Sequence, residues 1–440
     1  MSEMADVNKD GGMGSSWSSR VIRTVLVVLL LDLLGFTLIL PLLPSILDHY
    51  ANTGDVVYQS LQSLVDCFRE TLGIPLDKKY NNVLFGGLIG SLFSLLQFLS
   101  SPVTGALSDR HGRRPLLLLT TVGLMSSYVV WAMSHSFSLF LLFRVIGGVC
   151  KGNVSLCMAV VADLPCPKAR NRGMAMVGVA FSLGFTVGPL MGAYFALNSR
   201  MTGNGLHSTP ALLALAFSTA DLLVIWIMMP ETLTQEVKAS SSSLKDTNSL
   251  LNPVCLFKFS ALTNTEAPPP KQQMKKLQVL GLVYFFYLFL FSGLEFTLSF
   301  LTHQRFHFTS MQQGQMFFFI GVVMAIVQGG FARRIKPGKQ ISTVRMAIIT
   351  LIPAFIIIGL SWNVTVFYIG LTFYSFGSAA QKGTVMGILR SLGALARALG
   401  PVISSSVYWL AGPQTCFLVT AASFIVPITL LTSAAKIKEQ

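Results

Sequence analysis

The sequence predicts an all-α protein that crosses a membrane many times and consists of two related bundles of six helices. Hydrophobic residues make up 52% of the 440 residues and charged residues only 11%. This charged fraction is about half that of a soluble globular chain. Twelve apolar stretches are candidates to span a bilayer, and short motifs recur six stretches apart.

A spanning helix needs about 20 mostly apolar residues. The stretches that approach or exceed this length are 22–47, 82–107, 115–134, 138–162, 173–197, 210–229, 278–302, 311–332, 343–361, 364–380, 385–411 and 415–435. No small-residue cleavage site follows the first stretch, so we expect it to remain as an uncleaved helix.

The remaining segments set the expected domain boundaries. We interpret residues 1–20 as a disordered cytosolic tail because they are polar. The segment 230–276 contains ASSSS and PPP, which is typical of a flexible linker. The linker separates an N-terminal bundle, 21–229, from a C-terminal bundle, 277–435, and the final residues 436–440 form a second cytosolic tail. The other long loop, 48–80, has apolar residues at helical spacing, which predicts a short amphipathic helix on the opposite surface.

Basic residues determine the expected orientation. The net charge of +14 alone is compatible with nucleic-acid binding, but the basic residues follow the loops of one side. That side holds 23 of the 32 Lys and Arg residues, and four lie within predicted helices. The opposite side has only Arg69, Lys78, Lys79, Arg200 and Arg305. By the positive-inside rule, both termini are expected in the cytosol, and no nucleic-acid partner is expected.

Repeated motifs relate the two halves. GFTL at 35–38 corresponds to EFTL at 295–298, and RGMAMVG at 172–178 corresponds to KGTVMG at 382–387. SLG and GP then follow in both the fifth and the eleventh stretch. Because such repeats are typical of transporters, we expect a pathway between the halves near the bilayer midplane.

The loop after the second stretch reads GALSDRHGRR, residues 105–114. Gly105 and Gly112 permit a tight turn. Asp109 lies at the expected helix end, where a carboxylate can pair with Arg113 or face the positive end of another helix.

This loop resembles the signature loop of the major facilitator superfamily. The matching residues are Gly105, Asp109, Arg110, Gly112, Arg113 and Arg114. The resemblance implies the fold of that family and a latch on its cytosolic gate. The corresponding loop of the second half departs from the signature, with Arg333 in the acidic position and a displaced glycine, Gly338.

Two further motifs are similar to those of the same family. Arg144 with Gly148 resembles its RxxxG motif. The GxxxGPxxG pattern of its antiporters is matched by Gly184, Gly188, Pro189 and Gly192. Glycines every four residues let helices approach closely, so we expect these contacts to pack helices that rock between two arrangements.

Four cations lie inside predicted helices: Arg144, Lys151, Arg390 and Arg397. Each charge at a helix centre costs about 2.5–3.5 kcal/mol, so we expect these side chains to face the interior. Seven residues are nearly two turns, which places Arg144 and Lys151 on one helix face. We predict that these four residues bind substrate, with Lys151 as the preferred anion contact. For Arg144 a substrate contact, a carboxylate partner and a structural role remain open.

The intramembrane acids are Asp32, Asp221 and Glu295. Four cations against three carboxylates leave one positive charge uncompensated, which favours an anionic substrate. If a carboxylate takes up a proton, the excess grows, so proton and substrate can compete or cooperate at the same charges. We predict proton coupling at these acids, with Asp32 and Glu295 as first candidates; static ion pairs are the alternative.

Other chemistry receives little support from the sequence. His303 and His307 lie four residues apart at a helix end, where they can bind a metal or sense pH, although a solvated helix end is the simpler interpretation. We find no nucleophile, phosphate-binding loop or metal-ligand cluster, so no enzyme activity, cofactor or metal is expected.

The tenth stretch is short. From Ser136 to Gly173 there are 37 residues, but from Asn363 to the equivalent Gly383 only 20. We therefore expect a truncated tenth helix that turns back near Gly377, about 20 Å long against a hydrocarbon core of about 30 Å.

The resemblance implies a secondary active transporter of small organic anions or drugs that works by alternating access. We expect a proton-coupled, monomeric, multi-pass protein of the plasma membrane or an intracellular membrane such as the nuclear envelope or endolysosomes. The alternative is a non-transporting receptor or scaffold that keeps the fold, or an inactive shortened variant.

Overall fold

The structure is a computed structural model that describes residues 3–71, 80–201, 208–233, 257, 271–330, 340–381 and 389–436. These residues are almost entirely helical. The long helices are α1 (Glu3–Thr37), α4 (Asn81–His111), α5 (Arg113–Ala132), α6 (Phe137–Cys150), α7 (Asn153–Ala162), α8 (Pro167–Met201), α9 (Ser208–Met228), α14 (Lys271–Phe306), α15 (Ser310–Gly330), α16 (Gln340–Leu360), α17 (Val364–Gln381), α18 (Leu389–Ser423) and α19 (Ile425–Lys436).

The expected all-α, multi-pass architecture is confirmed. Nine segments within the described residues are long and apolar enough to cross a membrane, and α17 supplies a shorter apolar one. The long segment at the C-terminus contains two predicted spans, which meet at a kink where Gly412 adopts a φ of 83°. This left-handed conformation is accessible mainly to glycine.

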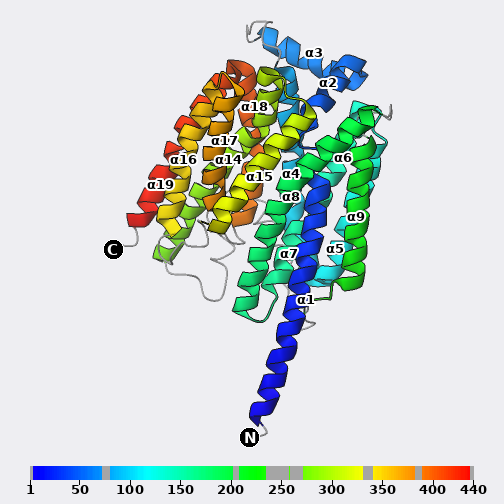
Figure 1. The fold of residues 1–440 in the computed structure, drawn as a ribbon, viewed down its shortest axis with the longest axis vertical. Helices are drawn as coiled ribbons and strands as arrows, with labels where there is room; N and C mark the ends of the chain where they lie inside the picture. Colours follow the sequence, from blue (N-terminus) through cyan, green and yellow to red (C-terminus); the bar gives the residue numbers. More distant parts are fainter. Residues whose placement is uncertain are drawn as a thin grey trace.

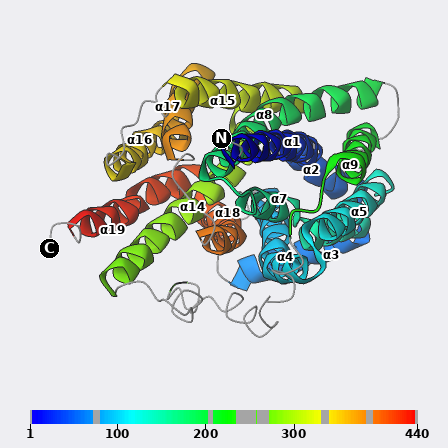
Figure 2. The same cartoon turned by 90° about the horizontal axis from the view of Figure 1, so that it is seen from below.

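The helices form two groups, α1 to α9 and α14 to α19, which lie side by side when the molecule is seen end-on (Figure 2). Within the groups, α1 packs on α8 and α14 packs on α18. Between the groups, α4 packs on α18 and α8 packs on α15. Under the repeat, α1, α4 and α8 correspond to α14, α15 and α18, so the contact of α1 with α8 corresponds to that of α14 with α18, and the contact of α4 with α18 to that of α15 with α8. The packing therefore follows the symmetry predicted from the repeated motifs.

Glycines permit the close contact of α8 with α1. A β-carbon at Gly184 would clash with Leu33, one at Gly188 with Thr37, and one at Gly192 with the backbone of Leu38. The Thr37 hydroxyl also donates a hydrogen bond of 3.0 Å to the Gly184 carbonyl. The packing role predicted for these glycines is thus visible in the structure.

Two short helices cover one end of the bundle. These are α2 (Leu43–Thr53) and α3 (Val56–Thr71), and they lie at the end opposite to both termini (Figure 1). Leu61 and Val65 of α3 pack against the core, whereas Leu64 is exposed. A short amphipathic helix is therefore present where the loop 48–80 predicted one.

Two predictions about the ends of helices were wrong. The chain is helical from Glu3, so the tail expected to be disordered continues the first spanning helix; an established helix extends readily residue by residue. The tenth helix does not turn back near Gly377 but continues to Gln381, for 18 residues. Its glycine packs instead against Leu351 and the carbonyl of Ala347 on α16. Most of the linker 230–276 and the second-half loop with Arg333 and Gly338 lie outside the described residues.

Candidate functional site

Lys151 and Asp32 form a buried ion pair between the fourth and the first spanning helices. The Lys151 Nζ lies 2.8 Å from both carboxylate oxygens of Asp32. The two side chains are only 3% and 2% exposed. Asn153 adds a long contact of 3.5 Å to Asp32 Oδ1. In this conformation Lys151, the preferred anion contact, already has a carboxylate partner within the protein.

The fourth span is broken at Lys151. Helix α6 ends at Cys150 and α7 begins at Asn153, while Lys151 has φ −75° and ψ 54°. The Gly152 N–H donates to the Cys150 carbonyl at 2.8 Å, as in an inverse γ-turn. Gln97 on α4 donates to the Lys151 carbonyl at 3.2 Å and so satisfies a backbone group released by the break. Broken helices are typical of transporter binding sites.

Arg144 is buried without an acidic partner. It is 7% exposed, and its Nε has no hydrogen-bond partner. None of the ion pairs in the described part of the chain includes Arg144. Its guanidinium instead lies 4.4 Å from the ring centroid of Phe93 and 5.7 Å from that of Phe143. Among the described cations predicted inside helices, Arg144 is therefore a buried one with no carboxylate partner, whereas Lys151 has one.

An aromatic pair connects the two cations. The Lys151 Nζ lies 4.7 Å from the ring centroid of Phe36, and the rings of Phe36 and Phe93 are 5.4 Å apart. The guanidinium of Arg144 lies over the second ring of this pair, that of Phe93. Lys151 and Arg144 thus lie on one connected wall, formed by α1, α4 and α6, as their spacing predicted.

Asp221 is a second buried acid in the same half. It lies on α9, is 1% exposed, and its Oδ1 has no hydrogen-bond partner. Asp32 and Lys151 are close enough to act on it electrostatically. Tyr128 lies in the electrostatic range of Asp32, Arg144 and Asp221, so the four groups form one polar cluster inside the N-terminal bundle.

The other predicted site residues lie elsewhere. Glu295 is on α14 in the C-terminal bundle, within hydrogen-bonding reach of Tyr374 on α17. Arg397 on α18 is exposed rather than buried, and the side chain of Arg390 lies outside the described residues. Of the described site residues, Asp32, Arg144, Lys151 and Asp221 lie in the N-terminal bundle, whereas Glu295 and Arg397 lie in the C-terminal bundle.

The signature loop forms a network at the end of the bundle that carries the N-terminus. Arg113 pairs with Asp109, as predicted, and its Nε also lies 3.1 Å from Asp163 Oδ2. The Glu231 carboxylate accepts hydrogen bonds from the backbone N–H groups of Arg113, at 2.9 Å, and Arg114, at 3.2 Å. A carboxylate is favoured at this helix N-terminus.

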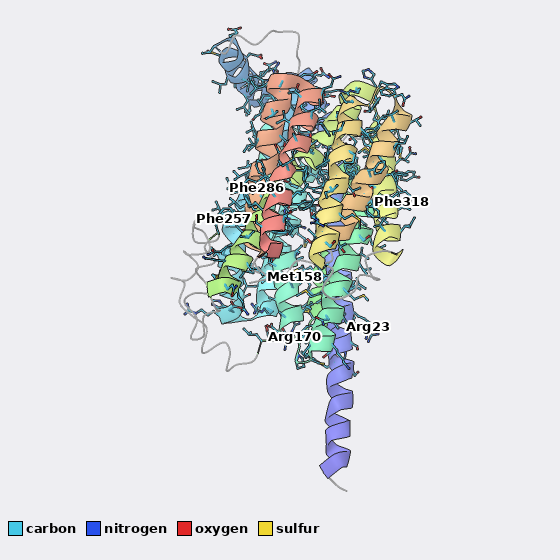
Figure 3. All side chains as sticks on the ribbon, turned by 90° about the vertical axis from the view of Figure 1, so that its left-hand side faces the viewer. Arg23, Met158, Arg170, Phe257, Phe286 and Phe318 are labelled. Atoms are coloured by element: carbon cyan, nitrogen blue, oxygen red, sulfur yellow. The ribbon has the colours of Figure 1, made fainter. Side chains whose placement is uncertain are left out.

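The turn between α4 and α5 depends on Gly112, because its φ of 108° is accessible mainly to glycine. A β-carbon at Gly105 would meet nothing within 4 Å, and Arg110 is exposed. Asp163 and Glu231 also belong to this network, but they lie 50 and 118 positions from Arg113, and the sequence gives no local signal of either contact. Figure 3 shows Arg23 and Arg170 toward this same end of the molecule, below Met158.

His303 and His307 do not face one common site. The Nε2 of His303 lies 2.6 Å from Asp48 Oδ2, which links α14 to α2. His307 is exposed and has a φ of 53°. The interpretation of both histidines as a solvated helix end was therefore wrong for His303, because its partner comes from the other half of the chain.

The chain was compared with known proteins. The family model described as Major Facilitator Superfamily matches residues 25–384. Major facilitator superfamily domain-containing protein 10 of Bos taurus is 53% identical over 431 residues, covering 94% of this chain and 92% of that protein. The class B tetracycline resistance protein of Escherichia coli is 24% identical over 403 residues, covering 88% of each chain.

Solved structures agree with this similarity. The crystal structure described as the human organic anion transporter MFSD10 (TETRAN) superimposes with a TM-score of 0.80 at 51% identity. The matched region covers 94% of this chain and 99% of the chain in that crystal structure. Together, the family match, the relatives and the shared fold show that the chain is a membrane transporter-fold protein of the major facilitator superfamily.

Proposed function

We propose that this protein is a secondary active transporter that exports small organic anions or drugs by alternating access and couples this movement to protons. The observation that carries the proposal is the buried guanidinium of Arg144, which has no acidic partner among the described residues. An unpaired buried cation is costly unless an anion arrives to compensate it. The description of the human relative as an organic anion transporter supports the same substrate class.

Arg144 is the first anion contact in this proposal, and Lys151 is the second. Lys151 is held by Asp32, so it becomes available only when Asp32 is neutralised or turns away. The anion and the proton therefore act on the same paired charges, either by competing or by binding together. Arg397 and Arg390 of the C-terminal bundle remain candidates to complete the site from the other side.

Asp221 is the preferred proton carrier. Its Oδ1 is buried without a partner, and an isolated ionised carboxylate is far more costly to bury than a neutral one. Glu295 beside Tyr374 is the corresponding candidate in the C-terminal bundle.

The proposal is tested by the flux of labelled organic anions into proteoliposomes, with a pH gradient of either sign and without one. We expect Arg144→Gln to abolish flux, and Asp221→Asn to keep exchange at equal pH but to lose accumulation driven by the gradient. Arg20→Gln is the matched control, because Arg20 is exposed and lies outside both the site and the signature loop. The sign of the effective gradient separates competition from joint binding of proton and anion.

The rival function is a receptor or scaffold that keeps the fold without transport. The short tenth helix favours it: α17 has 18 residues, against 26 for Phe137–Ala162, its counterpart in the first half. Absence of flux from folded protein over a broad panel of anions would establish the rival. Against it, α17 still places Tyr374 beside Glu295 in the interior.

A further inference from the structure

We propose that His303 and Asp48 form a second proton-binding site, which closes the outer end of the protein when His303 is protonated. The outer end is defined here as the end opposite to both termini (Figure 1). The inference rests on the proposed alternating access, since closing one end matters only if the two halves move. It concerns different residues from the central charge cluster.

The hydrogen-bond partners of His303 require an imidazolium. Its Nε2 lies 2.6 Å from the Asp48 carboxylate, and its Nδ1 lies 3.2 Å from the backbone carbonyl of Phe308. Both partners accept hydrogen bonds at these atoms. A neutral imidazole has only one N–H donor, whereas the protonated ring has two. Only protonated His303 therefore satisfies both contacts.

The Asp48 carboxylate is held in place by two consecutive side-chain hydrogen bonds. Asn82 on α4 donates to Asp48 Oδ1, and Tyr58 on α3 donates to the Asn82 amide oxygen. Burial raises the pKa of Tyr58, so its hydroxyl remains a donor at physiological pH. These hydrogen bonds orient the Asp48 carboxylate independently of His303, which reduces the conformational entropy lost when the ion pair forms.

The ion pair joins the two halves of the chain. Asp48 belongs to α2 and His303 to α14, which are 255 positions apart. Two neighbouring contacts cross between the halves at the same end, one between the hydroxyls of Ser45 and Ser310, at 3.1 Å, and one from Trp409 Nε1 to the Asn81 amide oxygen, at 2.9 Å. Neither of these contacts involves an acid or a base, so His303 and Asp48 supply the pH dependence.

The other charged groups near His303 have their own contacts or lie apart. On α14, Arg305 donates to the carbonyls of Gly359 and Ser361, and His307 is exposed. On α2, His49 lies against the ring of Tyr50, at 5.7 Å. On α3, Asp55 accepts from backbone N–H groups at the start of that helix.

The direction of the pH effect follows from the donor requirement. An unperturbed imidazole titrates near pH 6.5. The closed arrangement binds the proton of His303 more tightly than the open one, so closure is fully favoured below that pH and is lost progressively as the pH rises above it. Once His303 has lost the proton, one ring nitrogen faces an acceptor without a hydrogen, and the closed arrangement lacks both a charge pair and a hydrogen bond. An acidic compartment on the outer side thus favours the arrangement that is open toward the termini.

The test measures the distance between the outer ends of the two halves in liposomes by pulsed electron paramagnetic resonance. Nitroxide labels are attached through Met133→Cys, after α5, and Trp362→Cys, after α16, in a chain whose other cysteines are replaced. Both positions are exposed, at 61% and 78%. The adjacent Ser134 carbonyl accepts from Tyr50 and the Ser361 carbonyl from Arg305, which places both labels at the outer end.

We expect the short distance to increase in population from pH 8 to pH 5, with a change in the closed-to-open ratio of up to about tenfold per pH unit above about pH 6.5 and a plateau below it. His303→Gln and Asp48→Asn should remove this dependence. His135→Gln is the matched control, because His135 is an exposed histidine after α5 at the same end, and it should behave as the parent.

A parent chain without pH-dependent distances, or a His303→Gln variant that keeps them, overturns the proposal. The measurement requires no substrate. If the distances change with pH as expected while no anion is transported, the outer proton site is supported and the proposed transport function is refuted. If anions are transported while the distances do not depend on pH, the transport function is supported and the outer proton site is refuted.

Discussion

Replacement of Lys151 by methionine should destabilise the protein strongly. The change removes both 2.8 Å contacts of the Asp32 carboxylate and leaves it with the 3.5 Å contact from Asn153. Breaking a buried ion pair by removal of one partner costs about 3–5 kcal/mol.

The free energy of unfolding, measured by SDS titration in mixed micelles, should therefore fall by about 3–5 kcal/mol at pH 7. The loss should be smaller at acidic pH, since a protonated carboxyl group is less costly to bury than an ionised one. The double variant Lys151→Met with Asp32→Asn should recover most of the stability, because no charge remains unpaired.

Arg144→Met is the matched comparison, since this cation has no acidic partner in the described structure and its removal orphans no carboxylate. Its loss should be smaller than that of Lys151→Met and independent of pH. Two results would refute this reasoning about the buried ion pair. One is a Lys151→Met variant with a free energy of unfolding no lower than that of the double variant. The other is a loss in the free energy of unfolding that does not depend on pH.

Three further changes have specific expected outcomes. Gly188→Val should abolish folded protein in size-exclusion profiles because its side chain enters α1, whereas Gly178→Ala, which meets nothing within 4 Å, should be tolerated. Arg113→Met should lower the free energy of unfolding by about 1–3 kcal/mol through lost charged hydrogen bonds, and Arg110→Met, at an exposed position, should have little effect. The thiol of Cys166 should be alkylated at lower pH in the folded than in the denatured protein, because backbone N–H groups of the following residues lower its pKa; equal pH profiles would contradict this.

The fold followed from the sequence because its determinants are local or repeated. Apolar length indicates a spanning helix, and the glycine spacing around Gly188 indicates close packing. The pairing of Arg113 with Asp109 was also predictable, since the two residues are four positions apart. Helix ends were less predictable: the tenth helix continues past Gly377 because that glycine serves contact with α16 rather than a turn.

The sequence predicted which residues belong to the charged cluster but not which of them form an ion pair. The spacing of Arg144 and Lys151 indicated one shared face, but which cation meets a carboxylate depends on how α1 lies against α6. The break at Lys151 was not predicted, although Gly152 and Asn153 follow this residue directly. Asp48 and His303 are 255 positions apart, and nothing in either segment indicates that they meet.

The buried pair of Asp32 and Lys151 also constrains how the protein is made. Asp32 precedes Lys151 by 119 positions, so the first helix is synthesised and delivered to the membrane long before its partner exists. An acid at a helix centre opposes insertion by about 2.5–3.5 kcal/mol, and the run VLVVLLL before it supplies the compensating apolar surface. Until the fourth span arrives, the nascent chain carries an unmatched acid in the bilayer, a state that distinguishes incomplete from finished molecules during biogenesis.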